Sequence, residues 1–81
     1  MDPEAAFAEL LDAVGHREWN RVDECSRELL DWMERGGFPP VTVGNGTLGV
    51  EWHRAVATFV CYLAQSKVRD ARKCRERKRG A

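Results

Sequence analysis

Residues 50–71 read VEWHRAVATFVCYLAQSKVRDA, and no glycine or proline interrupts them. Apolar side chains recur in this stretch at the spacing of one helix face. The members of that stripe are Trp52, Val56, Phe59, Val60 and Leu63. We therefore predict a long helix over about residues 50–75, with this stripe, Phe59 included, facing the hydrophobic core.

Two shorter helices are predicted before it. Asp2 and Pro3 make a good helix start, because the carboxylate can cap the backbone and proline at the first helical position loses no hydrogen bond. Apolar residues follow at helical spacing, namely Phe7, Leu10, Leu11 and Val14. Gly15 is the expected stop, since glycine adopts the left-handed conformation at little cost. The first helix should cover about residues 3–14.

The second helix is expected over about residues 20–35, with Glu18 or Asn20 as its cap. Its apolar positions are Val22, Cys25, Leu29, Trp32 and Met33. The glycines at 36 and 37 end it, and the prolines at 39 and 40 prevent it from resuming. Because the connection between the first two helices is short, they are predicted to form an antiparallel helical hairpin.

The segment Phe38–Gly49, FPPVTVGNGTLG, separates the second and third helices. Val41 and Val43 alternate with a threonine, and a Gly-Asn-Gly turn follows, so a Gly/Pro-rich loop or a minimal β-hairpin is predicted. A phosphate-binding loop is the functional alternative, because the turn precedes a helix start. The consecutive lysine and serine or threonine of a P-loop are missing from it, because the segment contains no lysine.

The fold class predicted for the chain is all-α, with the antiparallel helical hairpin and a long third helix. Residues 1–66 should form a single helical domain, and residues 67–81 a basic C-terminal extension that is helical at first and frays at its end. Most of the aromatic side chains are expected in the core, namely Phe7, Trp19, Trp32, Phe38, Trp52 and Phe59. The third helix should overhang the hairpin with a thin apolar stripe. That overhang predicts self-association, most simply as a twofold dimer.

Charge is segregated along the chain, although 13 basic and 13 acidic residues cancel. Residues 1–35 contain ten acidic residues and four arginines, a net charge of −6. Residues 67–81 contain eight basic and two acidic residues, a net charge of +6. The basic residues are the candidate nucleic-acid-binding or partner-binding residues: Lys67, Arg69, Arg72, Lys73, Arg75, Arg77, Lys78 and Arg79.

Three interpretations of this basic segment are open. In the first interpretation, the segment is a nucleic-acid-binding arm that attracts phosphate without sequence preference. Alternatively, it docks on the acidic helices of its own chain or of a second copy, although exposed ion pairs are worth only about 0–1 kcal/mol each. The third interpretation is a solvated helix end whose cations complement the helix dipole.

No catalytic, metal-binding or cofactor-binding site is predicted. The two histidines, His16 and His53, are interpreted as solvated side chains or as local caps to a nearby glutamate. Cys61 lies two helical turns from His53, so the two cannot form a nucleophile–base pair directly. Three cysteines without CxxC spacing do not make a zinc site. Cys25 and Cys61 are expected to be small buried groups.

Several function classes are disfavoured by these features. The acidic start of the chain is unlike a secretory signal, and the uncharged run in the third helix is too short to span a bilayer, so a cytoplasmic protein that does not enter membranes is expected. The sequence predicts a small non-enzymatic protein–protein interaction or assembly protein, with itself as the first partner and another protein as a further one. The alternative is a nucleic-acid-binding accessory protein that uses the basic C-terminal helix.

Overall fold

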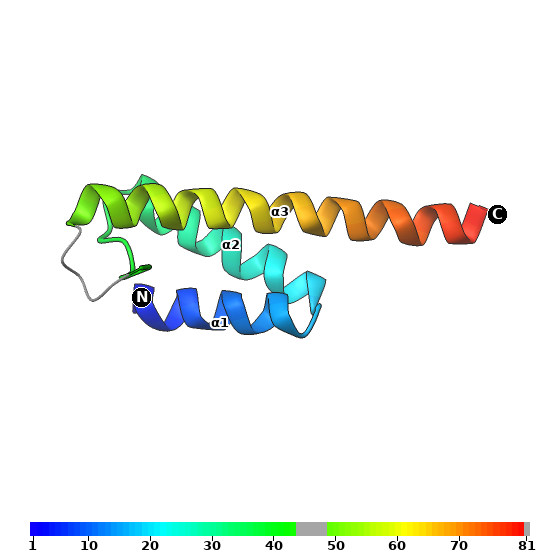
Figure 1. Ribbon diagram of the computed structural model, residues 1–81, viewed down its shortest axis with the longest axis horizontal. Coiled ribbons are helices and arrows are strands. Elements are labelled where there is room, and N and C mark those ends of the chain that lie inside the picture. The colour runs from blue at the N-terminus through cyan, green and yellow to red at the C-terminus, as the bar shows by residue number, and fades with distance from the viewer. Residues whose placement is uncertain (44–48, 81) are drawn as a thin grey trace.

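A computed structural model describes residues 1–43 and 49–80, with side chains through residue 74. Within these residues the chain has three helices and no strand: α1 Pro3–Gly15, α2 Trp19–Glu34 and α3 Val50–Gly80 (Figure 1). The predicted all-α class with three helices is confirmed. Residues 44–48, which contain the turn of the predicted loop or β-hairpin, lie outside the described residues.

α1 begins as the sequence predicts. The Asp2 carboxylate accepts hydrogen bonds from the backbone N–H groups of Glu4 and Ala5, at 3.1 and 3.3 Å. Its end differs from the prediction, because Gly15 is still helical and the left-handed residue is Arg17, with φ 55°. The turn is closed by backbone bonds instead, including one of 3.0 Å from the N–H of Glu18 to the carbonyl of Ala13. α2 therefore starts only a few residues after α1 ends.

α2 ends at its glycine pair, as predicted. Gly36 takes a φ of +90°, which side-chain-bearing residues rarely adopt. The N–H of Gly37 donates to the carbonyl of Trp32 at 2.9 Å, and the Trp32 indole N–H donates to the carbonyl of Phe38 at 2.8 Å. A Cβ at Gly37 would overlap the Trp32 ring. The indole therefore covers the glycine and directs the chain away from α2.

α2 is the central helix and packs against both of the others. Figure 1 shows α1 running beneath it and α3 passing above it. Its buried positions are Val22, Cys25, Ser26, Leu29, Leu30 and Met33. Four of the five apolar positions predicted for this helix are among them, and Trp32 is half-buried. α1 adds Phe7, Leu10 and Ala13 to the same core.

The face of α3 that packs on α2 is not the predicted one. Its buried residues are His53, Ala57, Cys61, Ala64 and Val68. Small side chains at three of these positions let the two helices approach closely, and they supply no bulky apolar groups of their own. The prediction that the large apolar residues of α3 face the core is wrong for Trp52, Phe59 and Leu63, which are exposed. The core position predicted for Phe38 is also wrong, because this side chain is 73% exposed.

The molecule is elongated because α3 is much longer than its partners. It measures 50 × 24 × 18 Å along its principal axes, and α3 extends well past the α1–α2 turn (Figure 1). The core on α3 reaches Val68, and the Ala71 side chain is half-buried. No helix among the described residues is both long enough and apolar enough to cross a membrane.

Candidate interaction surface

A row of apolar side chains runs along the surface of α3 and is formed by Trp52, Val56, Phe59 and Leu63. We call these four residues the α3 stripe. Trp52 is 65% exposed, Phe59 67% and Leu63 46%, while Val56 is half-buried. Their spacing of four, three and four residues is that of one seam of a coiled coil. The sequence predicts this row together with Val60 and assigns all five residues to the core. Val60 is partly buried against the core, whereas Trp52, Phe59 and Leu63 are at the surface.

The exposure of the α3 stripe follows from helix geometry. At about 100° per residue, the stripe lies roughly 130° around the helix from the Ala57–Ala64 face that contacts α2. α1 packs mainly on α2 and gives α3 little cover. A three-helix array arranged in this way leaves one side of α3 without a neighbour.

The basic residues of the C-terminal extension are distributed around α3. Lys67, Arg69 and Lys73 are exposed. Arg72 is exposed as well, and it bridges to α2, because its Nη2 donates to Oδ1 of Asn20 at 3.2 Å and lies 3.6 Å from Oδ2 of Asp23. That contact is of the kind expected if the extension docks on the acidic helices of its own chain. The remaining candidates lie in α3 beyond the described side chains, namely Arg75, Arg77, Lys78 and Arg79.

The two histidines lie in different environments. His16 is exposed, as predicted for a solvated side chain, and its ring Nδ1–H donates to the carbonyl of Asp12 at 2.9 Å instead of binding a glutamate. This hydrogen bond and the nearby Asp12 carboxylate raise the pKa of His16 above 6.5. The prediction for His53 is wrong, because this side chain is buried and its ring accepts a hydrogen bond from the backbone N–H of Thr42. Sequence reasoning missed this contact, since nothing in the sequence marks which helix face is covered.

The prediction that Cys25 and Cys61 are buried is confirmed, and Cys74 is exposed. Desolvation raises the pKa of the Cys61 thiol to about 11 and also raises that of Cys25. Neither buried thiol is therefore an ionised nucleophile at neutral pH. Within the described residues, no group of three His, Cys, Asp or Glu side chains is placed to hold a metal ion.

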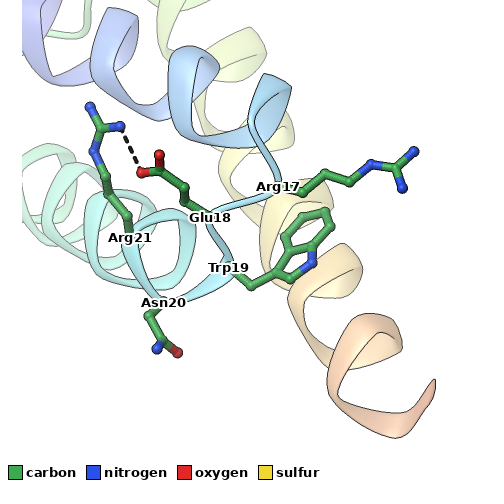
Figure 2. A pocket seen from close by; sticks show the side chains of 5 residues that line it. All are labelled: Arg17, Glu18, Trp19, Asn20 and Arg21. Carbon is green, nitrogen blue, oxygen red and sulfur yellow. Dashed lines mark hydrogen bonds and ion pairs between the residues drawn. The ribbon is translucent and has the colours of Figure 1, made fainter. Parts of the chain in front are cut away.

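A shallow pocket lies at the α1–α2 turn and is lined by Arg17, Glu18, Trp19, Asn20 and Arg21. Figure 2 shows that these side chains do not converge, because Arg17 points outward and Trp19 lies toward α3. Arg21 turns to the other side, where it binds Glu18 at 3.0 Å, Asp12 at 3.2 Å and Glu9 at 3.4 Å. The pairs with Asp12 and Glu9 tie α2 to α1. The polar groups of Glu18 and Arg21 are therefore engaged with each other and with α1.

The comparisons with known proteins add no relative. No protein-family model matches the chain, and neither a curated protein nor a solved structure is similar to it. Function therefore has to be inferred from the geometry of this chain.

Proposed function

We propose that the protein is a small non-enzymatic assembly protein that binds a second copy of itself through the α3 stripe. The observation that supports this is the exposure of three large apolar side chains, Trp52, Phe59 and Leu63, in one row on a helix. Single exposed apolar residues are ordinary, but a contiguous row marks an interaction site. Tryptophan and phenylalanine are also enriched in the buried centres of protein interfaces.

A second copy is the simplest partner for such a row. A seam with four–three spacing is self-complementary, since apolar side chains of one helix fit between those of an identical helix. A twofold dimer would bury both copies of the α3 stripe at once. The α1–α2 pair would then serve as the support that holds α3 in place, and the hydrogen bond from Thr42 to His53 would hold its first turns.

Nucleic-acid binding by the basic extension receives less support. At about 100° per residue, Lys67 lies roughly 160° around α3 from Arg69, whereas Arg69 and Lys73 are only about 40° apart. Of these three exposed cations, two therefore share one face of the helix, which is a small footprint for a phosphate backbone. Arg72 is already engaged with Asp23 and Asn20. Charge reversal of Lys67, Arg69 and Lys73 would test this alternative. A shift of generic RNA or DNA that disappears in the triple variant and at high salt would favour it.

The test of the proposed function uses two leucines that match in exposure. Leu63 in the α3 stripe is 46% exposed and Leu11 on α1 is 49% exposed. The wild-type protein, Leu63→Asp and Leu11→Asp would be compared by light scattering on a sizing column under reducing conditions. We expect a dimer for the wild type and for Leu11→Asp. We expect a monomer for Leu63→Asp, because a buried aspartate without a partner opposes association.

Circular dichroism of the two variants provides the folding control. Both substituted leucines are exposed in the single chain, so each variant should keep its helical signal. A wild-type monomer at concentrations of about 100 μM, where an interface of ordinary strength is saturated, would refute the proposal. A dimer that survives Leu63→Asp would show that the chain associates through another surface.

A further inference from the structure

We infer that the two copies associate with their α3 helices antiparallel, so that the basic extension of each copy lies against an acidic end of the other. This inference rests on the proposed function and adds the orientation of the pair. Three features of the chain support it, namely the residues that follow the α3 stripe, the positions of the acidic and basic side chains, and the small size of the stripe.

The continuation of the stripe disfavours a parallel pair. The same four–three spacing beyond Leu63 reaches Ser66, Asp70 and Lys73, and the last two are exposed. In a parallel pair each residue of a seam faces its own copy. Asp70 would then face Asp70 and Lys73 would face Lys73, and like charges in contact are destabilising. The apolar part of the seam therefore ends at Leu63.

An antiparallel pair uses the apolar part and avoids those contacts. The stripe is centred between Val56 and Phe59, so Trp52 of one copy would meet Leu63 of the other. At 1.5 Å per residue the stripe spans only about 17 Å. Beyond it, the extension of each copy leaves the overlap and passes the beginning of the other copy's α3.

In this antiparallel pair the basic extension passes an end of the other copy that is acidic. Figure 1 shows that α1 begins, α2 ends and α3 begins at the same end. Five exposed acidic residues belong to these helix ends, namely Asp2, Glu4, Asp31, Glu34 and Glu51. Two exposed arginines, Arg35 and Arg54, accompany them, which gives a net charge of −3. We call these seven residues the acidic end.

The basic extension complements this charge. Residues 67–81 carry a net charge of +6, and the Lys67, Arg69 and Lys73 side chains are exposed. In the antiparallel pair they approach the acidic end of the other copy. In a parallel pair the two extensions would run side by side, with +6 against +6. Electrostatic complementarity therefore selects the antiparallel orientation.

The size of the stripe indicates that these charges contribute to binding. A stable interface buries about 800 Å² on each partner, whereas a large aromatic side chain supplies only about 150–250 Å² when fully buried. Four partly covered side chains do not reach that area. Contacts between the extension and the acidic end supply the remainder, so the dimer should weaken as salt screens exposed charges.

Cys74 provides a reporter of the orientation, because it is exposed while Cys25 and Cys61 are buried. A spin label on Cys74 lies about 16 residues from the centre of the stripe on each copy. At 1.5 Å per residue the two labels would be about 50 Å apart in the antiparallel pair. In a parallel pair the same labels would lie across one helix–helix contact, about 10–20 Å apart.

A second label position makes the test independent of the geometry of one site. In Cys74→Ser/Lys67→Cys the labels move seven residues toward the centre on each copy. The antiparallel pair predicts that the label–label distance falls by about 20 Å, to about 30 Å. The parallel pair predicts almost no change. Light scattering on the labelled samples, at about 50 and 500 mM NaCl, checks that they are dimers and measures the loss of association at high salt.

The outcomes separate the orientation from the proposed function. A dimer with long distances that differ between the two positions supports the antiparallel pair. A dimer with short, equal distances overturns the orientation and leaves self-assembly through the α3 stripe intact. A monomer overturns both. An antiparallel dimer whose association does not change with salt would remove the role given to the acidic end.

Discussion

The backbone N–H of Thr42 donates a 3.0 Å hydrogen bond to Nδ1 of His53, a side chain that is only 4% exposed. A backbone N–H can only donate, so Nδ1 must be the accepting nitrogen of a neutral ring, whose hydrogen is then on Nε2. The Thr42 hydroxyl lies 3.1 Å from the same nitrogen. Pro40 is buried, and the contact between Thr42 and His53 fixes the segment that follows it to the first turns of α3.

Replacing His53 should loosen that attachment. His53→Ala leaves the Thr42 N–H without its acceptor and should destabilise the protein by about 1–3 kcal/mol. Hydrogen exchange at the Thr42 amide, followed by NMR, should become much faster in the variant. His53→Asn is the control, because its amide oxygen can replace Nδ1 as an acceptor, and it should retain part of the protection. Unchanged exchange in His53→Ala would contradict the assignment.

Truncation of one core residue and of one stripe residue should have different effects. Leu29→Ala removes a fully buried side chain and should lower the free energy of unfolding by about 2–5 kcal/mol at any protein concentration. Phe59→Ala removes an exposed one and should cost less than about 1 kcal/mol when the protein is dilute. Its effect should grow with concentration, because it weakens association. Chemical denaturation at two concentrations measures both, and a large loss for dilute Phe59→Ala would place that ring in the core.

Helix positions could be predicted from the sequence because their signals are local. The Asp2 cap, the glycines after Glu34 and the spacing of Val22, Leu29 and Met33 depend only on neighbouring residues. The left-handed residue of the first turn was missed for the opposite reason. The backbone N–H groups of Arg17 and Glu18 donate to carbonyls of the last turn of α1 and hold Arg17 at φ 55°. These hydrogen bonds outweigh the preference of Gly15 for the left-handed conformation.

The face of α3 that is buried could not be predicted because α3 carries two apolar faces. Hydrophobicity favours the face with Trp52, Phe59 and Leu63, whereas the structure buries the face with Ala57 and Ala64. Small residues permit close helix approach, and a sum of hydrophobicity does not register that advantage. The apolar spacing of the α3 stripe could therefore be recognised in the sequence. Its exposure could not, because that depends on which face of α3 packs on α2.

Thiol labelling should follow burial. Cys74 is exposed, whereas Cys61 is fully buried and has a pKa raised to about 11 by desolvation. Because the thiolate is the reactive form, one equivalent of iodoacetamide should react with Cys74 first near neutral pH. Cys25 and Cys61 should react only when the chain unfolds. Peptide mass spectrometry after short exposures identifies the labelled sites, and equal labelling of Cys61 and Cys74 would contradict the buried position of Cys61.

His16 should give a pH-dependent contribution to stability. Its pKa is raised by the hydrogen bond to the Asp12 carbonyl and by the Asp12 carboxylate, 3.3 Å from the ring. The folded state therefore holds the proton more tightly than the unfolded state does. The resulting stabilisation is complete below pH 6.5, the ordinary pKa, and disappears as the pH rises through the folded value. His16→Ala should accordingly lower the melting temperature more at about pH 5.5 than at about pH 8.

Asp12→Asn separates the two causes of this shift. The substitution removes the carboxylate charge but keeps the backbone carbonyl that accepts the bond from the ring. NMR titration of the His16 ring should therefore give a pKa between the wild-type value and 6.5. A value that falls to 6.5 would assign the whole shift to the charge, and an unchanged value would assign it to the backbone hydrogen bond. Because that carbonyl belongs to the last turn of α1, the second result would mean that the helix end itself attracts the proton.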